Sequence, residues 1–268
     1  GITWSEINTG GISTRYTPFG ILFGHKGPTA FFDNTKQLFY YLGFSNTKPF
    51  KNFKAIINST LSFTSGNMEE IPIIQNDNHI LLIFDIVSCC IKISKTDWDS
   101  RETSWDFQKN ELIRCKSNCG QNCADIDLLS IEDRDEILEI EKIPTDRNLL
   151  DDCYEAYKSK WNKMFFQLHR NEEELNRQFI EIYGLQDELT PDVPLEEITI
   201  LQEETSIENG ELVFHADEVF AQFVSYAVGC MFGRYSLDKE GLILANQGET
   251  LQDSVSYTHL RAHETVLD

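Results

Sequence analysis

The sequence predicts an α+β protein, with a small mixed domain followed by a mostly helical C-terminal region that contains one long helix and short strands. Three observations support this prediction. Residues 11–32 alternate β-branched or aromatic residues with polar ones between glycines and prolines, which indicates short strands and tight turns. Residues 36–58 hold two short apolar segments with helical spacing. Residues 149–183 repeat apolar residues at alternating steps of three and four.

The N-terminal elements follow from local sequence signals. The segments QLFYYLGFSN and PFKNFKAIIN are predicted to be two short helices. Pro49 suits the first turn of the second helix, because an N–H group at that position has no partner within the helix. The following segment, TLSFTSGNMEEIPII, is predicted to be an extended return strand that ends at Pro72.

The next part of the chain is predicted to be a helix followed by a tryptophan-rich loop. Asp77 or Asn78 is placed to cap a helix through HILLIFDIVSCCIKISK. Its core face is expected to consist of Ile80, Phe84, Val87 and Ile91. In the loop WDSRETSWDF, aromatic side chains are expected to anchor a polar connection against the helices; they are Trp98, Trp105 and Phe107.

The longest predicted element is a helical strut from Leu149 to Tyr183, roughly 50 Å long at about 1.5 Å per residue. Its apolar seam suits packing against another helix. The seam consists of Leu150, Tyr154, Tyr157, Trp161, Met164, Leu168, Leu175, Phe179 and Ile182. Gly184 is the expected residue after the C-cap, and Pro191 and Pro194 keep the acidic linker out of a helix.

A strand and an apolar helix are predicted after the linker. ELVFH is expected to be a strand, and Asp217 and Glu218 follow it at the positive end of the helix dipole. The apolar stretch from Val219 to Phe232 has 14 residues. A helix that crosses a bilayer needs roughly 20. The stretch is therefore predicted to be a core helix and not a membrane span.

The end of that helix carries two glycines four residues apart. Gly229 is expected to allow close packing and Gly233 to end the helix, followed by a turn at SLDKEG and a strand at LILAN. The final segment, SYTHLRAHETVLD, looks like translated adaptor or vector sequence. It is expected to be a non-native tail.

These elements group into five predicted parts. They are a target-recognition-like α+β domain (1–76), a helix with the tryptophan-rich loop and an insertion (77–148), the strut and linker (149–200), a strand–helix–hairpin element (201–253) and the tail (254–268).

Cysteine usage favours reduced thiols. The chain has seven cysteines, an odd number, and no secretory signal precedes them, which favours a cytoplasmic protein. Cys115, Cys119 and Cys123 lie four residues apart, with Cys153 further along. Structural zinc sites usually show C-x₂₋₄-C pairs at both ends, so incidental cysteines in an insertion are favoured. Whether these thiols bind a metal is left open.

The charge is distributed unevenly. The net charge is −21, yet residues 1–80 hold six Lys and Arg against five Asp and Glu, a net of +1. The other 188 residues hold 17 against 39, a net of −22. Since contacts with phosphates dominate nucleic-acid affinity, a DNA-binding surface is expected in the N-terminal third. The basic residues there are Arg15, Lys26, Lys36, Lys48, Lys51 and Lys54.

Catalytic motifs are missing from the sequence. Gly20, Gly24 and Gly27 do not have the spacing of a dinucleotide or S-adenosylmethionine loop, and no phosphate-binding G-x-x-x-x-G-K-[ST] occurs. Methylation of adenine N6 needs a [DN]-P-P-[YF] turn, yet none of the seven prolines adjoins another. No catalytic residue and no cofactor are therefore predicted for this chain, and no metal ligand is assigned. Its first methionine is Met68, which favours an internal piece of a longer protein.

Several segments resemble the C-terminal part of the PglX family, the adenine-specific DNA methyltransferases of BREX phage-defence systems. They are ITWSEINTGGISTRYTPFG, TLSFTSGNMEEIPII, WDSRETSWDF, NEEELNRQFIEIYGLQDELTPDV and FVSYAVGCMFGRYSLDKEGLILAN. LGFSNTKPFKNFKAIIN followed by FTSGNMEEIPII is also similar to recognition domains of combined restriction-modification enzymes, although SNTK departs from their pattern. Residues 111–148 match nothing in the family and look like a local insertion.

The resemblance implies a parent enzyme in which an upstream domain binds S-adenosylmethionine and this part recognises and orients double-stranded DNA. The DNA-binding candidates are Arg15, Tyr16, His25, Lys26, Lys48, Lys51 and Lys54. The alternative is a protein-interaction module, in which the strut and residues 219–249 dock other BREX subunits without direct DNA binding. No membrane contact is expected in either case.

Overall fold

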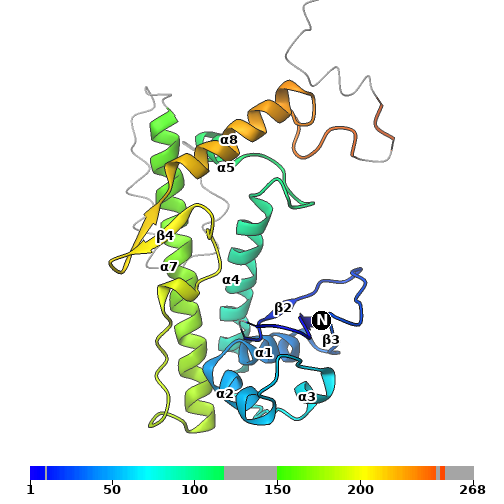
Figure 1. The fold of residues 1–268 in the computed structure, drawn as a ribbon, viewed down its shortest axis with the longest axis vertical. Helices are drawn as coiled ribbons and strands as arrows, with labels where there is room; N and C mark the ends of the chain where they lie inside the picture. Colours follow the sequence, from blue (N-terminus) through cyan, green and yellow to red (C-terminus); the bar gives the residue numbers. More distant parts are fainter. Residues whose placement is uncertain (10, 118–149, 246–247, 251–268) are drawn as a thin grey trace, which may run out of the picture. The chain divides into compact units, whose positions relative to one another are not determined.

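The structure is a computed structural model that describes residues 1–9, 11–117, 150–245 and 248–250, and it has the predicted α+β class (Figure 1). The chain divides into two compact units, each described here by itself. Unit 1 combines Gly1–Ile93 with Phe166–Ile198, and unit 2 combines Ser94–Phe165 with Thr199–Asp268. Helices α4 (Ile80–Asp99) and α7 (Leu150–Tyr183) each contribute residues to both units.

Unit 1 begins with a small antiparallel sheet. Its strands are β1 (Ile2–Trp4), β2 (Thr14–Tyr16) and β3 (Thr29–Ala30), in the order β2-β1-β3. Ile2 lies opposite Tyr16 on one side and opposite Ala30 on the other. The short strands predicted within residues 11–32 are confirmed. The central strand β1 was not predicted, because three residues are too few to show a period of two.

The two predicted short helices are confirmed as α1 (Thr35–Ser45) and α2 (Lys48–Ile57). The side chain of Asn34 caps α1 by accepting a hydrogen bond of 2.8 Å from the Lys36 N–H. Pro49 lies in the first turn of α2, as expected.

The return strand predicted for TLSFTSGNMEEIPII is wrong, because this segment contains helix α3 (Ser65–Glu69). The Thr64 hydroxyl accepts from the Asn67 N–H while the Asn67 side chain accepts from the Thr64 N–H, which forms a capping box. These local hydrogen bonds favour a helical turn over an extended chain. Within the described residues, the only strand-like pairing of this segment is an isolated antiparallel β-bridge between Ile7 and Ser62.

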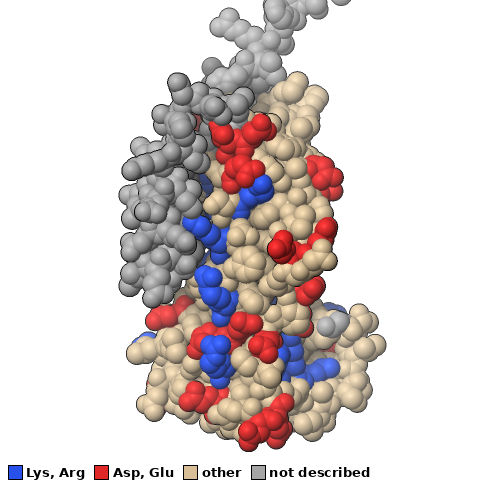
Figure 2. Space-filling view, turned by 90° about the vertical axis from the view of Figure 1, so that its left-hand side faces the viewer, with Lys and Arg blue, Asp and Glu red and all other residues tan. Residues whose placement is uncertain are grey.

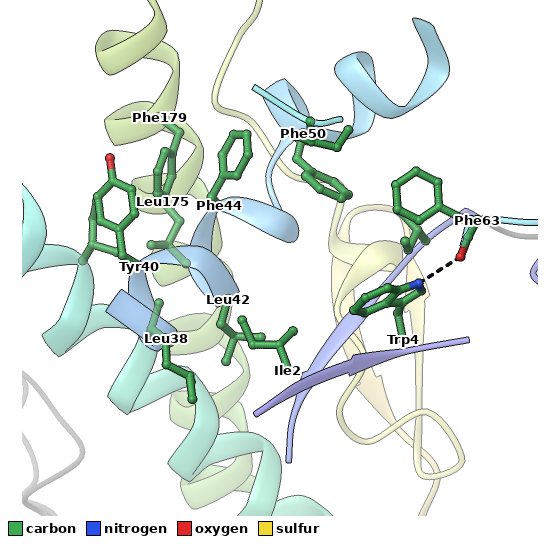
Figure 3. Close-up of a cluster of buried hydrophobic side chains, with 14 residues drawn as sticks. Ile2, Trp4, Leu38, Tyr40, Leu42, Phe44, Phe50, Phe63, Leu175 and Phe179 are labelled. Atoms are coloured by element: carbon green, nitrogen blue, oxygen red, sulfur yellow. Dashed lines mark hydrogen bonds between the residues drawn. The ribbon is translucent and has the colours of Figure 1, made fainter. Parts of the chain in front are cut away.

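The core of unit 1 is rich in aromatic side chains (Figure 3). Phe179 on α7 has no exposed surface, and its ring lies 5.2 Å from that of Tyr40 and 5.3 Å from that of Phe44, both on α1. The Trp4 Nε1–H donates a 2.9 Å hydrogen bond to the Phe63 carbonyl, which ties β1 to the segment before α3 (Figure 3). The second half of α7 therefore completes the core of the N-terminal third.

The long helix agrees closely with its prediction. The predicted seam residues from Tyr157 to Phe179 are buried, whereas Leu150 is 45% exposed and does not belong to the seam. Gly184 has a φ of +66°, and the Leu185 N–H donates to the Ile180 carbonyl at 2.9 Å, which ends the helix as expected. On α4, Val87 is buried as predicted. Phe84, which was expected to be in the core, is only partly buried, whereas its neighbour Ile83 is fully buried.

Gly43 marks a close approach of α1 to two other helices of unit 1. A Cβ added there would lie 2.9 Å from Val87 Cγ2 and 3.4 Å from Leu175 Cδ2. We expect Gly43→Ala to destabilise the protein by about 1–3 kcal/mol, because overpacking forces the neighbouring side chains apart. Urea unfolding would measure the effect. Gly66→Ala is the control, because Gly66 is exposed in α3; this change should be neutral or slightly stabilising.

Unit 2 contains helix α5 (Glu111–Ser117), a hairpin of β4 (Thr205–Glu208) and β5 (Glu211–Phe214), and helix α8 (Ala216–Met231). The predicted strand at ELVFH is confirmed by β5. Its partner β4 was missed, although Asn-Gly at Asn209 and Gly210 is a strong hairpin signal. Both residues have the positive φ that such a turn requires, +54° and +81°.

Helix α8 is confirmed in its extent but is less buried than predicted. Its buried residues are Val219 and Tyr226, and Phe232 at its end is 85% exposed. Gly229 lies against Tyr235, since an added Cβ would be 2.5 Å from the Tyr235 ring, and this confirms its packing role. Gly233 ends the helix with a φ of +73°.

Two smaller predictions in unit 2 are wrong. Residues 242–245 of the segment LILAN form no strand. Phe107 is buried as expected, but Trp98 is 58% exposed and Trp105 fully exposed. Polar contacts hold this loop instead, among them a 2.8 Å hydrogen bond from the Ser104 hydroxyl to Asp99.

The remaining predictions concern residues outside those described, namely Cys119, Cys123, most of the insertion in 111–148 and the tail at 254–268. No helix in the described part of the chain is both long and apolar enough to cross a membrane.

Candidate nucleic-acid interface

The N-terminal part of unit 1 is almost free of acidic residues. Between Ile7 and Met68 the sequence holds a single acid, Asp33, in a chain with a net charge of −21. On the face of the molecule drawn in Figure 2, basic and acidic side chains are interspersed. The near absence of carboxylates from these residues reduces the repulsion between their surface and a polyanion.

The loop between β2 and β3, residues 17–28, is anchored at its base. The Trp4 N–H donates to the Pro28 carbonyl at 3.3 Å, and the Glu6 N–H donates to the Lys26 carbonyl at 3.1 Å. The end of the loop that returns to β3 is thus fixed to β1 and the residues after it. In Figure 1 the loop extends away from α1, α2 and α3.

Four of the seven DNA-binding candidates lie on β2 and on this loop. Arg15 and Tyr16 are both exposed on β2, and the Tyr16 ring meets Phe39 edge-on at 5.8 Å. His25 is exposed at the end of the loop, and the Lys26 ammonium lies 3.3 Å from the Glu6 carboxylate. Because the Lys26 side chain remains 66% exposed, it is still accessible to a phosphate.

The other three candidates lie on α2 and are engaged within unit 1. The Lys48 ammonium donates to the Thr190 carbonyl at 2.9 Å, and Lys51 pairs with Glu197 at 3.2 Å. Both contacts join α2 to the segment that follows α7. Lys54 is partly buried near the end of α2. Lys48 and Lys51 therefore have structural partners that a phosphate would have to displace.

An open groove of about 370 Å³ lies at the foot of the loop. The residues that line it come from the loop, from the chain around β1 and β3, and from the start of α3; they are Glu6, Phe23, Gly24, His25, Pro28, Thr29, Thr64 and Ser65. It combines an apolar wall at Phe23 and Pro28 with hydroxyl groups, one imidazole and the Glu6 carboxylate.

Sequence reasoning missed the apolar residues at the tip of the loop. Phe19 and Leu22 are almost completely exposed, at 105% and 96% relative accessibility, and Phe23 is 60% exposed. The segment FGILFG could have drawn attention, because a short apolar run between glycines and after Pro18 has turn residues on both sides. It is too short to be a core helix and shows no alternation.

Glu172 on α7 shares the environment of Lys51. Burial raises the pKa of the Glu172 carboxyl to about 7, with a smaller upward contribution from Glu197 and an opposing effect of Lys51. A carboxyl whose pKa is raised in the folded state stabilises the fold below its unfolded pKa, and this contribution is lost as the pH rises through about 7.

We therefore expect Glu172→Gln to stabilise the protein at about pH 8 by about 1–2 kcal/mol, after discounting for partial solvent exposure, and to have little effect near pH 4. Urea unfolding at the two pH values measures the difference. Glu181→Gln, an exposed change on the same helix, is the control and should shift stability by less than about 0.5 kcal/mol at either pH. An equal effect of Glu172→Gln at both pH values would contradict the assignment.

Among the described residues, no group of three or more His, Cys, Asp or Glu side chains is arranged to hold a metal ion. Cys115 and Cys153 are partly buried. The remaining two cysteines of the predicted cluster lie outside the described residues, so the zinc hypothesis stays open.

Comparison with known proteins identifies the class to which this α+β chain is related, the adenine-specific methyltransferases. No protein-family profile matches the chain. The chain is 32% identical over 254 residues to adenine-specific methyltransferase BrxX of Escherichia coli O9:H4 (strain HS). This alignment covers 92% of the present chain and 18% of the relative. It is also 30% identical over 244 residues to adenine-specific methyltransferase PglX of Lacticaseibacillus casei (strain Zhang). That alignment covers 91% of the present chain and 17% of the relative.

The resemblance to the PglX family is therefore confirmed, and it extends over nearly the whole chain. The chain spans less than a fifth of the length of the curated relatives it matches.

Proposed function

We propose that this chain is the DNA target-recognition and scaffold portion of a site-specific adenine-N6 DNA methyltransferase in a BREX phage-defence system. The observation that carries the proposal is the similarity of over nine-tenths of the chain to less than a fifth of two adenine-specific methyltransferases. No two prolines adjoin in this sequence, so it contains no [DN]-P-P-[YF] turn for a target adenine. Catalysis and the binding of S-adenosylmethionine belong, in this proposal, to a domain outside the chain.

The DNA-binding side is proposed to be the β2 strand and the β2–β3 loop of unit 1. Arg15 and Tyr16 are exposed there, and His25 and Lys26 follow at the end of the loop. Lys48, Lys51 and Lys54 on α2 are proposed as secondary contacts, because the first two already have partners within the unit. The acidic remainder of the chain repels DNA and so restricts its orientation. We also propose that the protein is cytoplasmic, because a chain that binds bacterial DNA meets it there.

Duplex binding measured across a range of salt concentrations tests this proposal. We expect the chain to bind double-stranded DNA with an affinity that falls as salt rises, and Arg15→Gln to reduce the slope of log K against log salt by about 1. Arg177→Gln is the control, because Arg177 is an exposed cation of unit 1 that pairs with Glu174 on α7. Absence of salt-dependent binding, or equal effects of the two variants, would refute the proposed surface.

A second candidate function is a protein-interaction module that docks other BREX subunits. Exposed apolar side chains in unit 2 favour it, since Trp105 is fully exposed, Phe232 is 85% exposed and Met231 is 58% exposed. Aromatic side chains of this kind are enriched at protein interfaces. Co-purification of other BREX subunits with the wild-type chain but not with Trp105→Ser or Phe232→Ser would support this function, particularly if the chain has no affinity for DNA.

A further inference from the structure

We infer that the tip of the β2–β3 loop is an apolar wedge that enters between stacked bases of duplex DNA, with Phe19 and Leu22 as the inserted side chains. This inference rests on the proposed function, because it requires that the chain bind DNA. It adds a binding element that is separate from the basic residues and acts on the stacking of the bases.

The first support is the exposure of the tip. The Phe19 and Leu22 side chains have relative accessibilities of 105% and 96%, and Ile21 between them is 54% exposed. Single exposed apolar residues are common, but several large ones together mark a binding surface. A wedge must present apolar side chains that nothing in its own protein covers, and within the described residues this tip does so.

The second support is the construction of the loop. Its base is held by the backbone hydrogen bonds from Trp4 to Pro28 and from Glu6 to Lys26, and the Phe23 ring lies 5.2 Å from that of Phe31 next to β3. At the tip, Gly20 has a φ of +92° and no heavy atom within 4 Å of an added Cβ. The tip is therefore a turn without side-chain bulk at its centre, carried on an anchored base.

The third support is the charge of the surrounding residues, which favours DNA over an uncharged apolar partner. Arg15 precedes the loop in sequence, and Lys26 lies near its end, where it pairs with Glu6 but remains 66% exposed. No Asp or Glu occurs from residue 7 to residue 32. A side chain inserted into a base step comes close to the phosphates of both strands. Cations beside the wedge stabilise that position, and a carboxylate there would oppose it.

The relatives are named as adenine-specific methyltransferases, and a wedge would assist methylation of an adenine in a duplex. An enzyme that modifies a base in a duplex must first extrude the base, at a cost of a few kcal/mol for unstacking and unpairing. Apolar side chains inserted between base steps partly unstack them and kink the duplex. Phe19 and Leu22 would thereby supply part of the free energy needed to free the target adenine from the stack.

The experiment compares two 30-base-pair duplexes of the same length and charge, one fully paired and one with a central mismatch that weakens stacking. We expect the wild-type chain to bind the mismatched duplex about tenfold more tightly, because a wedge has less unstacking to perform there. In Phe19→Ser/Leu22→Ser the preference should fall to about twofold or less, while the salt slope stays unchanged because the phosphate contacts remain.

Ile56→Ser is the matched control, because Ile56 is an 82% exposed apolar residue of α2 outside the loop, and it should keep the wild-type preference. Three results would overturn the wedge while leaving the proposed function intact: no mismatch preference in a chain that binds DNA with a normal salt slope, no change in the double variant, or an equal change in Ile56→Ser. Binding of the tip to lipid vesicles or to a protein subunit, with DNA binding unaffected by the double variant, would also overturn it. A chain without any affinity for DNA would end both proposals.

Discussion

Arg101→Met is expected to destabilise unit 2 by about 3–5 kcal/mol, because it leaves two buried carboxylates without their cation. The Arg101 guanidinium lies 3.0 Å from Asp97 and holds Glu204 through both of its terminal nitrogens, at 2.5 and 3.1 Å. The side chains are 15%, 12% and 2% exposed for Arg101, Asp97 and Glu204. Water therefore cannot replace the lost partner.

The pH dependence gives this prediction a second readout. Burial raises the pKa of Asp97, and Arg101 opposes that effect. A carboxyl with a raised pKa stabilises the fold at low pH and loses that contribution as the pH rises. Removal of Arg101 raises this pKa further, so the destabilisation should be larger near pH 7 than near pH 4, where protonation neutralises the carboxyl.

Urea unfolding followed by circular dichroism at the two pH values measures the effect. Lys95→Met is the control within the same unit, because Lys95 is 59% exposed and pairs with Asp99 and Asp106 near the surface. It should change stability by no more than about 1 kcal/mol. Equal losses in Arg101→Met and Lys95→Met would show that the Arg101 cluster is not a buried network.

Phe179→Ala is expected to destabilise unit 1 by about 3–5 kcal/mol, since the ring is fully buried and its removal leaves a cavity. The cavity would lie between α7 and α1, where the ring contacts Tyr40 and Phe44. This substitution tests whether a segment more than a hundred residues away in sequence belongs to the core of the N-terminal third. Hydrogen exchange would report whether amides of α1 lose protection together with those of α7.

Phe19→Ala provides the matched control, an identical change of side chain at a fully exposed position in the same unit. We expect it to shift stability by less than about 0.5 kcal/mol. It removes a residue proposed to contact DNA and nothing from the core. If Phe179→Ala cost less than about 1 kcal/mol, the packing of α7 in the core of unit 1 would be contradicted.

Elements with long or well-capped sequence patterns were predicted correctly. The apolar seam recurs along most of α7, which has 34 residues, and Gly184 marks the end of the helix. Both the extent of the helix and most of its buried face therefore followed from the sequence. Helix α2 carried Pro49 in its first turn. Short elements were predicted less well, because α3 depends on a single capping box and β1 on three residues.

The candidate site was predicted in part. An uneven distribution of charge pointed to the N-terminal third, and Arg15, Tyr16, His25 and Lys26 are exposed there. The charge distribution did not reveal that Lys48 donates a hydrogen bond to Thr190 and that Lys51 pairs with Glu197, because these partners lie far away in sequence. It also did not distinguish the exposed Phe19 from a core aromatic residue.

The sequence by itself determined the α+β class, the long helix and the concentration of acid outside the N-terminal third, because composition and periodicity are local properties of the chain. Only the tertiary structure decided that Phe166–Ile198 completes unit 1, that Arg101 is surrounded by buried carboxylates and that Phe19 and Leu22 remain uncovered. Burial is the physical reason, since whether a side chain loses contact with water depends on residues that are distant in sequence and meet it only when the chain folds.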